Sequence, residues 1–385
     1  MIRVPLRLAA GCVLAEAVKM DLDSPPFDRC MLDGYAVRAV DTLEGAQLRI
    51  IGRQDAGGAA FTGTVTRGTC VAINTGAPVP AGADAILMVE HTEQSGEFVT
   101  VRKSPAAGWG TQRRGADAAR GQTVLEAGTL LGPVQIAVAA AAGVAEIAVI
   151  PRPRVAVLST GDELVPPERV PAGGQIRNSN GPMLAALAQR YAVLAGDPQW
   201  APDDPAPIRS KLLEALAGAE VVLVTGSLSM GTRDFVPAVL QEMGFTTHVQ
   251  TVKIKPGKPF VLATKEERWG GGSAARRFLI GLPGNPVSGF VCFHRFVRPL
   301  LARLAGGAMP ETGRALCDQG LVANGDREFY QPARLDHRVS PLTVSPLNWR
   351  GSADIYTLAK AQALIVHPVR APLREAGTVV DIIEL

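Results

Sequence analysis

The 385-residue sequence predicts an α/β fold whose central sheet is doubly wound and mostly parallel. Three short apolar runs of strand length carry this prediction, at residues 155–159, 220–225 and 277–281. Each run is followed by a glycine-containing loop and then by a segment with helical features. Because parallel strands are joined by helical crossovers, this alternation predicts helices on both faces of the sheet.

The helices of this domain are marked by residues that favour helix ends. Asn180 opens one of them, and Asp204 with Pro205 caps another, since Asp is a good N-cap and proline suits the first helical turn. The predicted helices span residues 180–190, 205–218, a segment ending near Gly244, and 286–304.

The flanking parts are predicted to be rich in β-structure. Before the α/β domain, residues 69–75, 85–90 and 146–150 are strand candidates, and an alanine-rich helix opens at Pro133 and ends at Gly143. After it, short alternating runs favour a β barrel or sandwich. The predicted domains are residues 1–24 with 113–150 (a discontinuous N-terminal linker and helical domain), 25–112 (a β-rich inserted domain), 151–305 (the α/β domain) and 306–385 (a C-terminal β barrel).

Composition limits the possible partners and location. The formal net charge is +3, from 39 basic and 36 acidic residues, so no global field indicates nucleic acid or an anionic membrane as a partner. The most apolar stretch, residues 134–150, is too short and too interrupted to span a bilayer. Five dispersed cysteines without a C-x-x-C pair, and no secretory leader, predict a cytoplasmic protein. Five isolated histidines do not indicate a zinc site.

Two of the predicted strands end in loops with acidic and small residues. Ligands bind in open α/β sheets at the carboxyl ends of the strands, where such loops converge. The first loop comprises Thr160, Gly161, Asp162 and Glu163, and is either an ordinary turn or a pair of carboxylates for Mg²⁺. The second begins with Gly226 and Ser227, whose backbone N–H groups would face an anion. Asp234 follows it, either as a helix N-terminal charge or as a metal ligand with Asp162.

A third group of residues combines lysines with proline and glycine. Lys255 and Lys258 flank Gly257 and would be point charges for a phosphate or an oxyanion, with the glycine allowing the backbone to approach the ligand. A further loop ahead of a helix contains Pro283, Gly284 and Asn285. Residues 225–286 therefore predict the phosphate-handling active site of an enzyme with a carboxylate-held metal.

Several longer motifs occur in a characteristic order. They are Ser24-Pro-Pro-Phe-Asp28, Asp33-Gly-Tyr-Ala-Val37, Thr75-Gly-Ala-Pro78, Ser159-Thr-Gly-Asp-Glu163, Lys255-Pro-Gly-Lys-Pro259 and Gly281-Leu-Pro-Gly-Asn-Pro-Val287. In these motifs the chain resembles the molybdopterin molybdenumtransferases, the family of bacterial MoeA and the gephyrin E domain. The resemblance extends from about Ala9 to the C-terminus.

The resemblance implies a reaction and a set of site residues. The family inserts molybdate into the dithiolene of adenylylated molybdopterin and releases AMP, which implies those two substrates and Mg²⁺ as cofactor. It implies that Asp234, with Glu163 or Asp162, holds Mg²⁺ against the pyrophosphate. The other implied functional residues are Asp28, Asp33, Thr75, Asp203 (pterin or metal contact, or part of a helix N-cap region), Lys255 and Lys258 (phosphate or molybdate) and Ser352 (molybdate).

The resemblance also implies partners. Family members are elongated homodimers, so Asp28, Asp33 and Thr75 are expected to reach the α/β domain across a domain or subunit boundary. The upstream adenylyltransferase is a further expected partner, and neither nucleic acid nor a membrane is expected. At one position the chain departs from the family pattern, because it has Thr225-Gly-Ser-Leu-Ser229 where Ser-Gly-Gly-Val-Ser is common. Ser227 thereby places a Cβ where the backbone would approach a ligand.

Two alternative functions, and the choice between molybdate and tungstate as substrate, stay open. The chain could adenylylate the pterin, as a related single-domain family does, but the flanking β domains and the Asp28 and Thr75 motifs argue against this. It could be a non-catalytic dimeric scaffold, although Asp234, Lys255 and Lys258 would then have no purpose. The sequence does not distinguish molybdate from tungstate.

Overall fold

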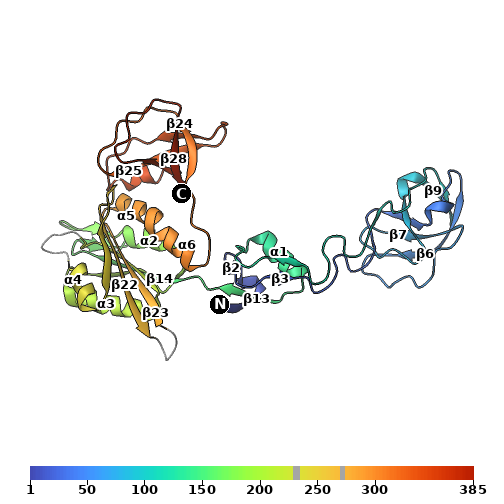
Figure 1. Ribbon diagram of the computed structural model, residues 1–385, viewed down its shortest axis with the longest axis horizontal. Helices are drawn as coiled ribbons and strands as arrows, with labels where there is room; N and C mark the ends of the chain where they lie inside the picture. The colour runs from blue at the N-terminus through green and yellow to red at the C-terminus, as the bar shows by residue number, and fades with distance from the viewer. Residues whose placement is uncertain (229–234, 269–273) are drawn as a thin grey trace. The chain divides into compact units, whose positions relative to one another are not determined.

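The computed structural model describes residues 1–228, 235–268 and 274–385. The chain forms two compact units, Met1–Val149 and Ile150–Leu385, each with buried apolar clusters of its own (Figure 1). Within the described ranges, no helix is both long enough and apolar enough to cross a bilayer.

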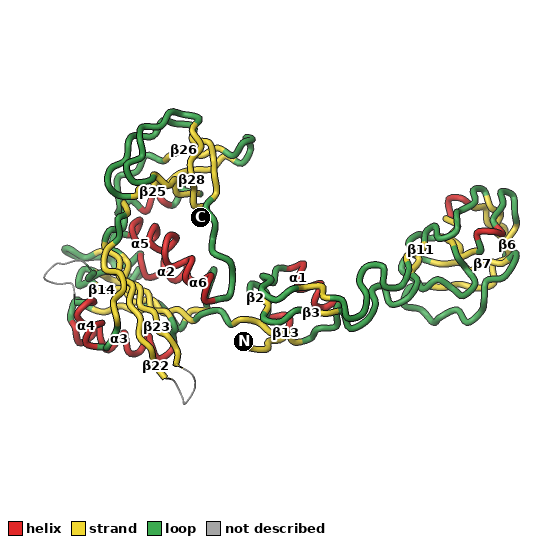
Figure 2. Tube along the Cα trace, in the orientation of Figure 1, coloured by secondary structure: helices red, strands yellow, loops and turns green. Residues whose placement is uncertain are grey.

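The first unit contains a group of short strands and one helix (Figure 2). The helix α1 (Pro133–Ala141) begins with proline and is followed by Gly143 at φ +80°, so both predicted helix ends are confirmed. The antiparallel pairing of β1 with β13 brings the start of the chain beside residues 146–150. The strands are β1 (Ile2–Pro5), β13 (Glu146–Ile150) and β2 (Val13–Leu14) in one sheet, and the pair β12 (Thr123–Leu125) with β3 (Val18–Lys19). A further pair, β11 (Thr111–Gln112) with β4 (Arg29–Cys30), belongs with the six-stranded sheet, because Cys30 lies in one of that sheet's buried clusters.

A six-stranded sheet forms the rest of this unit. The strands predicted at residues 69–75 and 85–90 are each confirmed in their first part, as β7 and β8. Residues 89–91 form a 3₁₀ turn instead. In sheet order the strands are β8 (Ala85–Met88), β5 (Gly34–Val37), β7 (Thr69–Ile73), β6 (Gln47–Gln54), β10 (Phe98–Val101) and β9 (Thr92–Ser95).

The second unit is built on a seven-stranded sheet, and the predicted fold class is confirmed. Its central strands β14, β19 and β23 are parallel, and the fully buried run Val-Val-Leu-Val-Thr of β19 is typical of a strand covered on both faces. At one edge, β22 and β20 are antiparallel. The order is β17 (Val193–Leu194), β14 (Arg154–Thr160), β19 (Val221–Thr225), β23 (Ala274–Leu282), β22 (Pro259–Arg268) and β20 (Thr246–Thr251), with β18 (Gln199–Ala201) also paired to β14.

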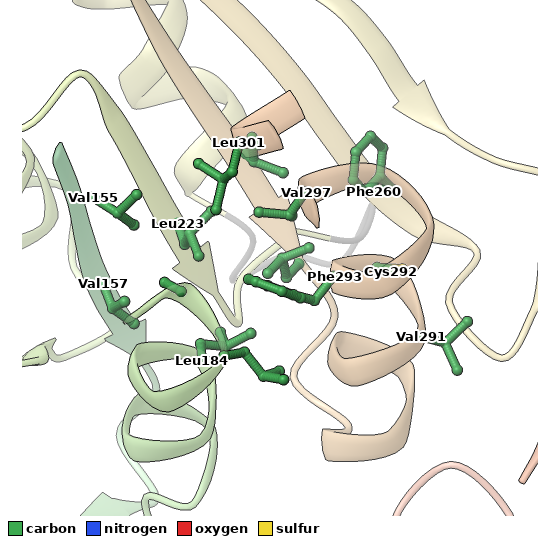
Figure 3. Close-up of a cluster of buried hydrophobic side chains, with 14 of the residues drawn as sticks. Val155, Val157, Leu184, Leu223, Phe260, Val291, Cys292, Phe293, Val297 and Leu301 are labelled. Carbon is green, nitrogen blue, oxygen red and sulfur yellow. The ribbon is translucent and has the colours of Figure 1, made fainter. Parts of the chain in front are cut away.

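Helices cover both faces of this sheet, as predicted (Figure 1). Alternate residues of β14 point to opposite faces, so Val155 and Val157 join one apolar cluster while Ala156 and Leu158 join the other. Figure 3 shows the first cluster, in which Phe293 lies among the buried side chains of strands and helices. The helices are α2 (Asn180–Gln189), α5 (Pro286–Cys292) and α6 (Arg298–Leu304) on that face, and α3 (Pro205–Gly218) and α4 (Val236–Glu242) on the other.

The long helix predicted for residues 286–304 is present but is not uniform. A π-helical segment, η4 (Phe293–Val297), separates α5 from α6. It places His294 in the interior, where the side chain is only 3% exposed and neither ring nitrogen has a hydrogen-bond partner among the described residues. Burial, and after it the positive charges of Arg298 and Arg190, lower the pKa of His294 to about 3.

The C-terminal part of the second unit is a closed β barrel, as predicted. Strand β25 pairs with β26 on one side and with β27 on the other, which closes a ring of five strands. The short strand β21 (Ile254–Lys255) adds to β25 and so ties the barrel to the α/β domain. The ring runs β25 (Glu328–Asp336), β26 (Thr343–Pro346), β24 (Gly313–Cys317), β28 (Thr378–Glu384) and β27 (Ala363–His367), and the helix α7 (Ile355–Leu358) precedes β27. A small parallel pair, β15 (Leu164–Val165) and β16 (Ile176–Arg177), completes the unit.

Candidate active site

The carboxyl ends of four parallel strands meet at one edge of the large sheet. Ser159 of β14 is in register with Thr225 of β19, and Thr225 with Leu282 of β23. On the other side of β14, Thr160 is in register with Ala201 of β18. The loops that follow these strands therefore begin side by side, as strand-end reasoning predicts.

These loops line a cleft of about 880 Å³, a volume in the range of small-molecule sites. Nine of the predicted site residues are among its lining: Thr160, Gly161, Glu163, Asp203, Gly226, Ser227, Pro283, Gly284 and Asn285. The cleft is bordered on another side by Ala353, Ile355 and Tyr356, at and just before α7. It therefore lies between the α/β domain and the β barrel of the same unit.

Glycine is required at position 226 for two separate reasons. Its φ is +99°, a conformation that side chains disfavour. A Cβ built there would also lie 2.3 Å from the carbonyl oxygen of Thr160. Gly226 thus lets the loop after β19 pass directly against the end of β14, which draws the two strand-end loops together.

Ser227 and Asp203 connect two of these loops. The hydroxyl of Ser227 hydrogen-bonds to Oδ1 of Asp203, and the backbone N–H of Asp203 donates to Oδ1 of Asp162 over 3.0 Å. Ser227 itself has φ +46°, in the left-handed region. Ser227 therefore has a left-handed backbone and at the same time contacts a cleft carboxylate.

The two neighbouring aspartates after β18 have different tasks. Asp204 is the N-cap of α3, and its Oδ1 accepts from the N–H of Ala206 over 2.8 Å. Asp203 is half-buried and lines the cleft. Asp203 was expected either to contact the pterin or the metal, or to belong to a helix N-cap region. Since Asp204 is the residue that caps α3, the carboxylate of Asp203 is available to a ligand.

Asn180 is a cleft residue that sequence reasoning treated only as a helix start. Its Nδ2 donates to the carbonyl oxygen of Gly284 over 2.6 Å and to Oγ1 of Thr225 over 3.2 Å. The Oγ1 of Thr225 in turn donates to the carbonyl oxygen of Pro283 over 3.2 Å. These bonds hold the loop after β23 in place. The sequence offered one signal for this role, an asparagine at a helix start beside a glycine. The hydrogen-bond partners of Asn180 are more than 40 residues away in sequence, so the pattern could not identify them.

Lys255, Lys258 and Ser352 are not among the described residues that line the cleft. Lys255 is exposed on β21, with its Nζ 5.2 Å from the centre of the Phe329 ring, a cation–π geometry. Lys258 is also exposed. The carbonyl oxygen of Ser352 accepts from the N–H of Val287 over 3.0 Å, which places its backbone at the start of α5.

The glycine between the two lysines has a packing task. Gly257 is buried at φ +118°, and a Cβ there would lie 2.7 Å from Sγ of Cys292. Burial raises the pKa of the Cys292 thiol, so this cysteine is a neutral packing partner. Gly257 is therefore required for close packing against α5, and the approach of a ligand to its backbone stays a prediction.

Asp28, Asp33 and Thr75 belong to the first unit, where two loops are tied together. Oδ1 of Asp33 accepts from the N–H of Thr75 over 2.8 Å and from its hydroxyl over 3.1 Å. Oδ1 of Asp28 accepts from the N–H of Arg114 over 2.8 Å. The N–H of Val79 donates to the carbonyl oxygen of Asp28 over 2.8 Å, so residues 28–33 and 75–79 form one local structure.

The carboxylates at the cleft fit Mg²⁺ in their chemistry. Among the described residues no group of three or more His, Cys, Asp or Glu could hold a metal ion by itself, and Asp234 lies outside the described residues. Glu163 and Asp203 line the cleft, and Asp162 bonds to Asp203. Mg²⁺ is commonly held by one or two carboxylates together with substrate phosphates, and this donor set suits that arrangement.

The chain matches known proteins over nearly its whole length. Family models described as "MoeA N-terminal region (domain I and II)", "Probable molybdopterin binding domain" and "MoeA C-terminal region (domain IV)" match residues 1–143, 156–303 and 314–385. The molybdopterin molybdenumtransferase of Haemophilus influenzae is 32% identical over 366 residues, 94% of this chain and 88% of the relative. That of Nostoc sp. is 32% identical over 395 residues, 99% and 88% of the two chains.

Solved structures agree with these matches. The crystal structure of the molybdopterin biosynthesis MoeA protein from Pyrococcus horikoshii OT3 superimposes with a TM-score of 0.79 and 27% identity, covering 100% of this chain and 94% of that one. The fold and its strand-end cleft define a multidomain transferase with a molybdopterin-binding-type α/β domain. The chain belongs to the molybdopterin molybdenumtransferase family, which confirms the resemblance, and it acts in molybdenum cofactor biosynthesis.

Proposed function

We propose that the protein inserts molybdate into adenylylated molybdopterin in a Mg²⁺-dependent reaction that releases AMP. The observation that carries this proposal is the cleft where the loops after β14, β18, β19 and β23 converge, with carboxylates on two of them. A substrate with a pyrophosphate link needs both a metal and hydrogen-bond donors to its phosphates, and the strand ends of open α/β sheets are where such groups converge on a ligand.

The acidic residues of the cleft are proposed to handle the metal and the pyrophosphate. Glu163 and Asp203 would hold Mg²⁺, with Asp234 and Asp162 as further candidate ligands. When bound, Mg²⁺ would neutralise the negative charge that develops as the phosphoanhydride bond breaks. Ser227 holds Asp203 through its hydroxyl, and Asn180 holds the loop of Gly284. Both residues thereby keep the cleft in one geometry before the substrate arrives.

The cationic and hydroxyl residues next to the barrel are proposed to handle the oxyanion. Lys255 and Lys258 are exposed, so their ammonium groups are available to molybdate or to phosphate. Ser352 precedes α7, whose residues border the cleft. The proposed assignment is therefore an oxyanion subsite served by Lys255, Lys258 and Ser352, beside the pyrophosphate subsite at the strand ends.

The paired loops of the first unit are proposed to complete the machinery in a homodimer. Asp28, Asp33 and Thr75 would then act on substrate held by the α/β domain, and the hydrogen bonds of Asp33 to Thr75 would keep that pair oriented. The upstream adenylyltransferase, which makes the adenylylated substrate, is the proposed protein partner. The proposed location is the cytoplasm.

Two adjacent aspartates provide the test of the cleft assignment. Purified Asp203→Asn protein, given adenylylated molybdopterin, molybdate and Mg²⁺, should release AMP at least about tenfold more slowly than the unmodified protein, the loss typical of a removed metal or transition-state contact. The control is Asp204→Asn, because Asn caps α3 nearly as well as Asp and Asp204 is a helix cap. Equal rates for Asp203→Asn and Asp204→Asn would refute the assignment.

The same assay distinguishes the two alternative functions. An adenylyltransferase would consume ATP when it is given metal-free molybdopterin that is not adenylylated, and the proposed reaction does not consume ATP. A scaffold would release no AMP from adenylylated molybdopterin while keeping its fold. Replacing molybdate by tungstate in the same reaction would show which oxyanion the protein prefers.

A further inference from the structure

Tyr356 is a residue of the cleft that no predicted motif includes. It lies on α7 and borders the cleft together with Ala353 and Ile355. Its side chain is 79% exposed, whereas Tyr35 and Tyr330 are 5% and 0% exposed. Tyr356 therefore lines the cleft with a largely solvent-exposed side chain that adds little to the core.

The helix that carries Tyr356 is held firmly. Asp354 caps it, accepting hydrogen bonds from the N–H of Arg350, from the N–H of Thr357 and from the hydroxyl of Thr357, which lower the pKa of Asp354 to about 2. Leu358, at the other end of the helix, is buried in the core shared with the α/β domain. Because the backbone is fixed, the ring is placed with only two side-chain torsions left to order.

Among the residues that the structure describes, the cleft lining offers no second aromatic ring. Among the described lining residues, Tyr356 is the one aromatic side chain. The charged ones are Glu163, Asp203 and Arg177. The remaining lining is made of small, polar and aliphatic residues and prolines. The strand-end loops thus suit phosphate and metal, and one side of the cleft offers a π face.

We propose that Tyr356 stacks on a planar ring of the substrate and so contributes to the affinity of the cleft for that substrate. This inference rests on the function proposed above, since adenylylated molybdopterin carries a flat aromatic adenine at one end and a reduced pterin with one planar pyrimidinone ring at the other. Stacking of a nucleobase on an aromatic side chain is sequence-tolerant and contributes to affinity through the π face. Tyr356 thereby acts as a binding residue, separate from the carboxylates that handle the pyrophosphate.

The test compares three substitutions in the full-length protein. Tyr356→Phe keeps the ring, Tyr356→Leu keeps the apolar bulk without a π face, and Tyr356→Ala removes both. With adenylylated molybdopterin as the substrate, the Leu and Ala variants should raise KM about fivefold or more, while the Phe variant stays within about twofold of the unmodified protein. The matched control is Phe98→Ala, which removes an exposed ring from β10 in the other unit.

Two competitive inhibitors identify which ring is stacked. The inhibition constants of AMP and of 6-hydroxymethylpterin should change unequally in Tyr356→Leu. The inhibitor whose inhibition constant rises about fivefold or more carries the ring that Tyr356 stacks on. An unchanged KM in both Tyr356→Leu and Tyr356→Ala would overturn the stacking, as would a Phe variant as poor as the Leu variant. Absence of product from the unmodified protein would instead overturn the proposed function, together with the substrate named here.

Discussion

Ser227 combines an unfavourable backbone conformation with a favourable side-chain contact, and two substitutions separate these contributions. Its φ of +46° is left-handed, which costs a residue with a Cβ about 1 to 2 kcal/mol. Its hydroxyl hydrogen-bonds to the half-buried carboxylate of Asp203. A hydrogen bond to a charged group contributes about 1.5 to 3 kcal/mol net when it is buried, and partial exposure places this one near the lower figure.

The two substitutions should therefore differ in the free energy of unfolding. Ser227→Ala loses the hydrogen bond and keeps the backbone strain, so it should destabilise the protein by about 1.5 kcal/mol. Ser227→Gly loses the same bond but adopts the left-handed conformation freely, and the relief of strain outweighs the greater entropy of its unfolded chain. Glycine should then be more stable than alanine at this position by about 1 kcal/mol.

Urea unfolding followed by tryptophan fluorescence measures this difference, because Trp200 donates its indole N–H to the carbonyl oxygen of Gly161 in the adjacent loop. Both variants should also lose activity equally, since both release the carboxylate of Asp203. An alanine variant that is as stable as the glycine variant would refute the strain argument. A glycine variant with full activity would refute the orienting contact.

Gly226→Ala should destabilise the protein by more than about 2 kcal/mol. The new Cβ would collide with the carbonyl oxygen of Thr160, and alanine disfavours the positive φ of this position. Thermal unfolding measures the loss of stability. Gly45→Ala, at φ +83° with open space around it, incurs only the conformational cost and serves as control. His294 has a lowered pKa, so it stays neutral in the folded state while the unfolded chain takes up a proton below about pH 6.5. The contribution of His294 to stability should therefore fall between about pH 6.5 and 3, by about 1.4 kcal/mol per pH unit, and His294→Leu should reduce the measured pH dependence of stability accordingly.

The architecture around the cleft follows from local sequence signals. Buried apolar runs such as that of β19, followed by glycine and a helix start, dictate parallel strands with their loops at one edge. The residues at the strand ends could for this reason be grouped from the sequence alone. The barrel was also predictable, since β27 and β28 lie where short strands were predicted.

Other features depend on contacts that sequence patterns do not express. Strand β20 is an edge strand with mostly exposed polar residues, so it lacks the apolar periodicity by which strands are recognised. Tyr356 and Asn180 join the cleft through tertiary packing of α7 and α2. The position of Asp203 in the cleft, next to the helix cap Asp204, likewise depends on tertiary structure. The roles of these residues follow from their positions in the folded structure and could not be inferred from residue type alone.

The central claim is that this cleft converts adenylylated molybdopterin and molybdate into molybdenum cofactor and AMP. The most direct measurement is a single-turnover reaction of the unmodified protein, in which released AMP and the cofactor formed, assayed by reconstitution of a metal-free molybdoenzyme, are counted together. We expect one AMP per cofactor, with both products lost when Mg²⁺ or molybdate is withheld. Cofactor formed without AMP release, or AMP release that proceeds unchanged without Mg²⁺ and molybdate, would contradict the account.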